Sequence, residues 1–327
     1  MKQGKLVTPI TIKDFSLFRK FKNGYKNTLT YNAQAVNGWN PKGESKHRLG
    51  LKYYDGDNLL TIGHFQRNGS KHFHLIPCES SIQKIKELAK ILFEISGSSV
   101  YIKKIGKEQR DTLLIASAFF EVNEDDGWSE NAPLEDDTHP EQIIDSETIL
   151  EELDKTRKQS QVKDTYVRAI KRYVDSGRLK VEYYDSTNTR QRKDALRIVQ
   201  KFFDIQEERK NNLSVPEDYF NIVNLKPAGV DYFSSIFYVD EKPAAFYFAE
   251  RAEEIVHVYA NLTLRDEFRY LSEFILIHLL QEAFKKGVKK ANLGGSETKG
   301  LDDFKRKFKP IGQNKMYWLL FKPTQQQ

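Results

Sequence analysis

The chain has 327 residues, of which 39% are hydrophobic and 30% charged, and its formal net charge is +6. These values are typical of a folded, water-soluble protein with a sizeable core, and the length suits two domains better than one. No run of about 18 apolar residues occurs and the first residues lack the apolar stretch of a signal peptide, so we expect no transmembrane segment and a cytoplasmic location. The single cysteine, Cys78, excludes an intrachain disulfide and a multi-cysteine metal site.

Charge is spread unevenly along the chain. Residues 121–154 are strongly acidic, whereas residues 155–201 and 299–322 are rich in lysine and arginine. A segregated basic surface can attract nucleic acid, acidic lipid or a phosphorylated substrate. A solvated surface that keeps the protein soluble explains the same pattern, and charge alone favours this simpler explanation.

The first half has the pattern of an α/β domain that begins with hairpins. Residues 12–21 carry apolar positions at helical spacing, and residues 49–54 and 59–65 flank a turn-rich segment, as in a β-hairpin. Further on we predict a strand at 72–77, a helix at 82–95 capped by Ser80 or Ser81, a strand at 100–102, a helix at 108–115 and a strand at 119–122. Residues 123–146 have little apolar periodicity and predict a solvated loop.

The second half repeats this order of elements. Predicted helices span 146–176 (one long helix or two in succession), 190–205, 215–223 and 267–286, and the last of these is expected to end at Gly287 as a left-handed C-cap. Predicted strands span 179–184, 232–239, 244–250, 255–260, 288–293 and 316–321, the last of which is expected to close the second sheet. We therefore expect an α/β (α+β) fold of two similar half-domains, residues 1–150 and 151–327, each with a mixed sheet flanked by helices.

The most distinctive stretch lies near the end of the chain. Asn292-Leu293-Gly294-Gly295 ends a predicted buried strand, and two adjacent glycines let a ligand or another backbone approach closely. A polar loop follows, and then a very basic helical turn that includes Lys305, Arg306 and Lys307. This basic turn can meet an anion.

These residues resemble the end of the Fem-type transferases and of the phosphatidylglycerol lysyltransferase C-terminal (DUF2156-like) domains. In those families an Asn-Leu-Gly or Asp-Phe-Gly-Gly strand end precedes a Gly-Leu-x-x-Phe-Lys-Lys/Arg-x-Phe-Gly run. Here the second run is Gly300-Leu301-Asp302-Asp303-Phe304-Lys305-Arg306-Lys307-Phe308, and Ser272-Glu273-Phe274 fits the preceding helix. The specific match covers about the last 70 residues.

The resemblance implies two tandem GNAT-like (acyl-CoA N-acyltransferase-like) half-domains and an aminoacyltransferase. Such an enzyme moves an aminoacyl group from aminoacyl-tRNA to an amine or hydroxyl acceptor, and positioning and electrostatics supply most of the catalysis. No cofactor is expected. The implied partners are aminoacyl-tRNA and a small-molecule, peptide or carrier-bound acceptor.

The resemblance also implies roles for particular residues. Lys305 would contact the tRNA terminus or the oxyanion, and Glu273 would bind the amino group of the aminoacyl moiety. The expected substrate-binding residues are Asn261, Asn292, Gly294, Gly295, Ser296 and Phe304. The expected tRNA- or phosphate-binding residues are Arg265, Arg269, Lys299, Arg306 and Lys307. A solvated helix end and a surface-facing Glu273 are the alternative explanations, and no metal site is predicted.

Other activities have weaker support. A GNAT domain that uses acyl-coenzyme A holds the pyrophosphate on a glycine-containing loop at a helix N-terminus, but residues 259–272 contain no glycine. An acyl-coenzyme A or acyl-carrier N-acyltransferase with an altered loop remains one alternative, and a non-catalytic binding module on the same fold is the other. Signatures of serine hydrolases, P-loop NTPases and dinucleotide-binding enzymes are absent. We interpret His257 and His278 as hydrogen-bonded structural histidines.

Overall fold

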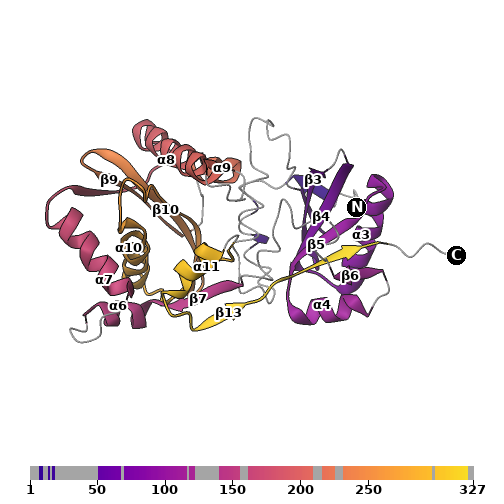
Figure 1. The fold of residues 1–327 in the computed structure, drawn as a ribbon. Coiled ribbons are helices and arrows are strands. Elements are labelled where there is room, and N and C mark those ends of the chain that lie inside the picture. The colour runs from indigo at the N-terminus through magenta and orange to yellow at the C-terminus, as the bar shows by residue number, and fades with distance from the viewer. Residues whose placement is uncertain are drawn as a thin grey trace. The chain divides into compact units, whose positions relative to one another are not determined.

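The computed structural model describes residues 7–9, 14, 17–18, 51–67, 70–115, 118–121, 140–154, 161–208, 216–224, 231–296 and 299–322. The chain divides into two compact units, residues 1–140 together with 314–327, and residues 141–313 (Figure 1). Within the described ranges each unit contains one seven-stranded mixed sheet flanked by helices, which confirms the expected α/β class. The predicted helix at 12–21 lies almost wholly outside these ranges.

The first unit is built on a sheet of order β1-β2-β3-β4-β5-β14-β6. Its strands are β1 (Val7–Pro9), β2 (Leu51–Tyr54), β3 (Leu59–Arg67), β4 (Ser70–Glu79), β5 (Val100–Ile105), β6 (Phe119–Glu121) and β14 (Tyr317–Phe321), and its helices are α3 (Ile82–Ser96) and α4 (Lys107–Leu114). The β2–β3 hairpin forms as predicted, and β4 and β5 are parallel because α3 crosses over between them.

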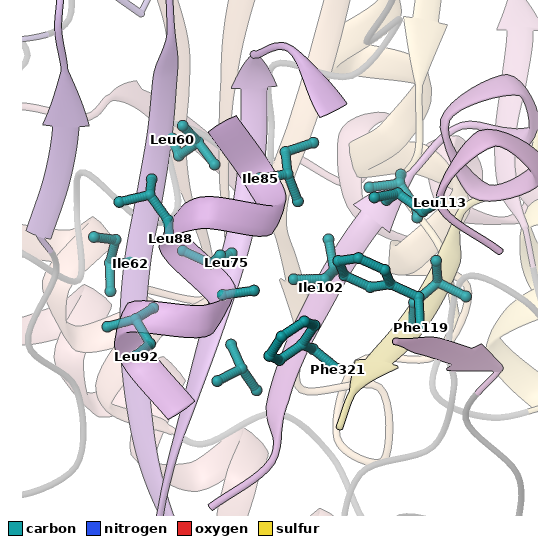
Figure 2. Packing of buried hydrophobic residues seen from close by; sticks show 14 of the residues in the cluster. Leu60, Ile62, Leu75, Ile85, Leu88, Leu92, Ile102, Leu113, Phe119 and Phe321 are labelled. Atoms are coloured by element: carbon teal, nitrogen blue, oxygen red, sulfur yellow. The ribbon is translucent and has the colours of Figure 1, made fainter. Parts of the chain in front are cut away.

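Helix α3 shows why this unit folds as the sequence pattern predicts. The Ser81 hydroxyl accepts a hydrogen bond from the Lys84 amide at 3.2 Å, and Gly97 ends the helix with a φ of +64°. Figure 2 shows the apolar face of α3 packed on side chains that alternate along the strands. The helices contribute Ile85, Leu88 and Leu92 from α3 and Leu113 from α4, and the strands contribute Leu60, Ile62, Leu75, Ile102, Phe119 and Phe321.

The last strand is where the sequence prediction was wrong. β14 pairs antiparallel with β5 and β6 of the first sheet, so that Leu319 lies opposite both Ile102 and Glu121. It does not close the second sheet. The apolar pattern identifies a strand from local residues, but it does not reveal that the strand will lie between β5 and β6, which are distant in the chain. The first unit therefore contains the chain end, unlike the predicted range 1–150.

The second unit is built on a sheet of order β13-β7-β12-β11-β10-β9-β8. Its strands are β7 (Glu141–Asp145), β8 (Leu179–Tyr183), β9 (Tyr232–Val239), β10 (Lys242–Ala252), β11 (Ile255–Thr263), β12 (Lys290–Asn292) and β13 (Gly312–Asn314). Its helices are α6 (Ser146–Asp154), α7 (Gln161–Ala169) continued by a π-helical turn (Ile170–Val174), α8 (Thr189–Glu208), α9 (Pro216–Asn224), α10 (Leu271–Lys285) and α11 (Lys299–Arg306). None of the helices in the described ranges is long and apolar enough to cross a membrane.

Helices cover both faces of this second sheet. Tyr247 of β10 contacts His278 of α10 on one face, whereas its neighbour Phe246 packs on Tyr184, whose hydroxyl donates to Val223 of α9 on the other. Successive strand residues point to opposite faces, so an uninterrupted apolar run such as β10 fits a sheet buried on both sides. Figure 1 shows α8 and α9 above the sheet of this unit and α7 and α10 below it.

Two further predictions need correction, and one is confirmed. Residues 141–145 were expected in a loop but form β7. The pattern missed this strand because Glu141 and Gln142 are polar, and their buried side chains bond to partners distant in the chain. α10 begins at Leu271, not at 267, because Tyr270 has a left-handed φ of +71° that a helix cannot contain. Gly287 has a φ of +80° after α10, as expected for a left-handed C-cap.

Candidate functional site

Strands β11 and β12 separate at the centre of the second sheet. β12 pairs in parallel with only Ile255–His257, whereas β11 continues to Thr263. Immediately after β12 the chain turns at Gly294, whose φ is +74° and whose N–H donates to the Asn292 side-chain oxygen at 2.8 Å. We call Gly294–Gly295 the glycine turn. A side chain at Gly294 would be strained, which explains the glycine there.

Asn292 fixes the start of the glycine turn. Its side chain is fully buried, and its Nδ2 donates to Glu141 Oε2 at 2.9 Å while its Oδ1 accepts from Gly294. Glu141 on β7 is also fully buried. A buried amide bonded from both ends orders the backbone around it. The contacts of Asn292 are thus structural, and its predicted role with substrate stays a prediction.

Lys305 of α11 reaches back to the glycine turn. It is 7% exposed, and its ammonium donates to the Gly294 carbonyl at 3.1 Å and to the Gly295 carbonyl. A buried ammonium is stable only with such acceptors. The structure therefore brings Lys305, Asn292, Gly294 and Gly295 together, and it holds a positive charge at the point where β12 ends.

Glu273 and Lys307 form an ion pair beside this lysine. Glu273 lies in the first turn of α10 with 7% of its surface exposed, and its Oε1 is 3.2 Å from Lys307 Nζ. The same ammonium lies 5.6 Å from the ring centroid of Phe304, which packs edge-on against Phe308. Glu273 thus faces inward, and a cation already occupies the position predicted for an amino group.

Arg306 and Lys299 have acidic partners of their own. Arg306 Nε donates to Asp302 Oδ2, one helical turn earlier, and exposed Lys299 lies 2.8 Å from Asp303. The consecutive basic residues 305–307 therefore have different partners: Lys305 meets the two carbonyls of the glycine turn, Arg306 meets Asp302 and Lys307 meets Glu273.

Two predicted residues keep polar atoms without a hydrogen bond. Ser296 is fully buried and its hydroxyl has no partner, and the same holds for the side-chain oxygen of half-buried Asn261. Neither atom has a hydrogen-bond partner among the residues that the structure describes. Such atoms are suited to receive a polar ligand group, since leaving them unpaired is costly.

The two histidines differ from each other. His278 Nδ1 is 3.2 Å from the Tyr247 hydroxyl, which agrees with a structural histidine, and burial lowers the pKa of its imidazole. His257 is 2% exposed, its Nδ1 has no hydrogen-bond partner among the described residues, and burial lowers its pKa to about 3. His257 is therefore neutral near pH 7.

Arg265 and Arg269 lie in the turns between β11 and α10, and both are exposed. The structure does not bring them into the cluster formed by Lys305 and the glycine turn. Three amides of this segment are already bonded: Arg265 N–H donates to the Thr263 carbonyl, and the N–H groups of Glu267 and Phe268 donate to the Leu264 carbonyl. These amides cannot also hold a pyrophosphate in the way a glycine-rich loop does.

The sequence did not reveal four polar residues that support this site. Gln142 Nε2 donates to Asp302 Oδ1 at 2.8 Å, Gln313 Nε2 donates to Gln142 Oε1 at 3.1 Å, and Glu141 holds Asn292. The four-residue spacing of Asp302 and Arg306 on a helix was an available signal. Glu141 and Gln142 gave none, because their partners are 151 and 160 positions away.

Known structures resemble the whole chain. A conserved protein of unknown function from Bacteroides thetaiotaomicron has a TM-score of 0.70 at 12% identity, with 97% of this chain and 99% of that chain covered. FemX gives 0.58 at 13% identity, covering 96% of each chain. L-PGS from Bacillus licheniformis gives 0.57 at 16% identity, covering 95% of this chain and 92% of that one. No family model and no curated protein matches.

At these low sequence identities, the likenesses define the fold of the chain. A tandem GNAT protein from the clavulanic acid biosynthesis pathway has a TM-score of 0.52 at 6% identity, covering 96% and 97% of the two chains. The chain therefore has the tandem GNAT fold. Within that class, the likeness to FemX and L-PGS agrees with the resemblance seen in the C-terminal motif.

Proposed function

We propose that the protein is an aminoacyltransferase that moves an aminoacyl group from aminoacyl-tRNA to an amine or hydroxyl acceptor. The observation that carries the proposal is the position of Lys305, a buried ammonium held on both carbonyls of the glycine turn where β11 and β12 separate. The tandem GNAT fold and its likeness to FemX and L-PGS support the same activity.

The proposed step is an acyl transfer without redox change. The acceptor nitrogen or oxygen attacks the ester carbonyl of the charged tRNA, and the carbonyl oxygen becomes an oxyanion. The bond to the ribose oxygen then breaks, and the proton lost by the acceptor ends on the ribose hydroxyl. A fixed cation stabilises the oxyanion most effectively where water is excluded, which suits Lys305. Asn261 and Ser296, whose side-chain oxygens have no hydrogen-bond partner among the described residues, would position the substrate.

Glu273 is proposed to bind the amino group of the aminoacyl moiety. The Lys307 ammonium now lies 3.2 Å from the Glu273 carboxylate. The ammonium of the substrate would take its place, so the buried carboxylate would have a cationic partner before and after binding. The residues proposed to contact tRNA phosphates all carry a positive charge at the exposed surface, and they are Arg265, Arg269, Lys299 and Arg306.

An acyl-coenzyme A donor is the second candidate, but the structure favours it less. Three amides before α10, those of Arg265, Glu267 and Phe268, are bonded to the carbonyls of Thr263 and Leu264. The Glu273 carboxylate lies in the first turn of α10, where its negative charge would repel a pyrophosphate.

The test is retention of radiolabelled aminoacyl-tRNAs by the purified protein at two salt concentrations. We expect selective retention of one charged tRNA, weakened by salt and by Lys305→Met, which removes the charge but keeps most of the side-chain volume. Lys285→Ala, which removes an exposed charge at the far end of α10, is the control and should have little effect.

Equal or absent retention of charged and uncharged tRNA would reject the proposal, and a rise in melting temperature with coenzyme A would favour the second candidate. A binding module would retain charged tRNA but give no turnover above the Lys305→Met background.

A further inference from the structure

A depression of about 480 Å³ lies beside the C-terminal end of α11. It is lined by Gln142, Arg306, Pro310, Ile311, Gly312 and Gln313, all of which belong to the second unit. The volume is in the range of small-molecule sites in proteins. Apart from the phosphate contact proposed for Arg306, none of the roles described so far accounts for this depression.

The charged group of this depression is the guanidinium of Arg306, and a buried carboxylate holds it in place. Arg306 is 52% exposed, but its Nε donates to Asp302, which is 4% exposed. With Nε bound, the guanidinium still has its two terminal nitrogens, whose N–H groups lie side by side. This arrangement matches two oxygens of a phosphate group.

Asp302 is itself fixed by a chain of amides. It accepts a hydrogen bond from buried Gln142 at 2.8 Å, and Gln142 accepts one from Gln313 at 3.1 Å. The exposed Gln313 lies at the wall of the depression, so the chain runs from the wall to the base of the arginine. Asp302 and Gln142 are positioning residues, since they act through Arg306 and Gln313.

The remaining wall is apolar and open. Ile311 is an exposed large apolar residue, and Pro310 lies next to it. A Cβ added at Gly312 would meet nothing within 4 Å, so a ligand can approach the backbone there. An apolar wall beside a fixed arginine and an amide suits a ligand with a phosphate at one end and a flat, partly apolar body at the other.

We propose that this depression binds a nucleotide, with its phosphate on Arg306 and its ribose and base along Pro310 and Ile311. The source of the nucleotide rests on the proposed function: it is the terminal part of the tRNA donor. Lys305 and Arg306 are adjacent on α11, which advances about 1.5 Å per residue, so the phosphate contact and the acyl site share one rigid element. A free mononucleotide has the same chemistry and is the other source.

The test is calorimetric titration of the full chain with adenosine monophosphate, adenosine and inorganic phosphate. Adenosine monophosphate should bind more tightly than either fragment, because each fragment fills one end of the depression. Arg306→Ala should weaken that binding at least about tenfold, the loss expected for a charged hydrogen-bonded pair. Gly312→Leu should abolish binding without lowering the melting temperature, since its side chain enters open space. Lys285→Ala should bind normally.

Asp302→Asn tests the positioning role. It should weaken the binding of adenosine monophosphate while leaving that of adenosine unchanged, because only the phosphate end depends on Arg306. Asp302 is buried, so its substitution can destabilise the fold. If Asp302→Asn lowers the melting temperature, the binding measured with Gly312→Leu tests the site instead. An RNA hairpin with the acceptor end of tRNA should compete with adenosine monophosphate if tRNA is the source, and failure to compete would favour the free mononucleotide.

No binding of adenosine monophosphate, equal binding of adenosine, or normal binding by both Arg306→Ala and Gly312→Leu would overturn the inference. These outcomes are distinct from failure of the proposed function. Nucleotide binding without retention of charged tRNA would keep this site and reject the aminoacyl-tRNA donor. Retention of charged tRNA that is unchanged in Gly312→Leu would keep the donor and reject this depression as the place where the tRNA end binds.

Discussion

His257 lies on β11 opposite Glu250 of β10 and Asn292 of β12, with burial as the cause of its low pKa of about 3. The unfolded chain binds a proton at this residue below a pH of about 6.5, whereas the folded chain does so only near pH 3. The folded state therefore loses stability as the pH falls between these values, by roughly 2–3 kcal/mol at pH 4.5.

We predict that His257→Gln removes this pH dependence. The free energy of unfolding should be measured by urea denaturation at pH 7 and pH 4.5 for both proteins. The wild-type protein should lose about 2–3 kcal/mol more than the variant over this interval. An equal loss in both would show that His257 is protonated in the folded protein.

The Glu273–Lys307 pair gives a second residue-scale prediction. Because Glu273 is 7% exposed, Lys307→Met should leave a buried, unpaired carboxylate and cost more stability than the double variant Glu273→Gln/Lys307→Met. A double-mutant cycle on the free energy of unfolding should give a coupling of at least about 1 kcal/mol. A coupling near zero would mean that the two side chains do not meet in solution.

At the scale of elements, the turn after α10 leads directly into β12 and the glycine turn. Gly287 has a φ of +80°, and a Cβ added there would meet nothing within 4 Å, so Gly287→Ala introduces backbone strain without a clash. We predict a cost of about 1–2 kcal/mol, measured by thermal or urea unfolding.

Gly300→Ala is the matched control for that substitution. Gly300 lies in α11 without a positive φ, and an added Cβ again meets nothing within 4 Å. Alanine is the better helix former, so this variant should be as stable as the wild type or slightly more stable. Equal losses at both glycines would contradict the assignment of strain to Gly287.

At the scale of the whole molecule, the chain end completes the first sheet. β14 lies between β5 and β6, and Leu319 is fully buried in the core of the first unit. Leu319→Asp should therefore expose the amides of β5 and β6 to hydrogen exchange while the strands of the second unit keep their protection. Ile95→Asp, at a position 70% exposed on α3 in the same unit, should change little. Loss of protection in β9–β11 instead would contradict the division into units.

Much of the element order could be predicted because it depends on local pattern. Ser81 caps α3 and Gly287 ends α10 through contacts within a few residues, and the alternation in β3 and β4 needs no distant partner. The start of α10 was missed because the left-handed backbone of Tyr270, a non-glycine residue, leaves no mark in the sequence. β7 was missed because its first residues are polar.

The features of the candidate site likewise fall into those visible in the sequence and those visible only in the structure. The sequence by itself determined that a buried strand ends in two glycines and is followed by a basic helical turn, since both features are continuous in the chain. Only the tertiary structure decided that Lys305 meets the glycine turn, Arg306 meets Asp302 and Lys307 meets Glu273. Consecutive helical residues point about 100° apart, and their acceptors come from other elements, so like charges in sequence acquire different chemistry in the fold.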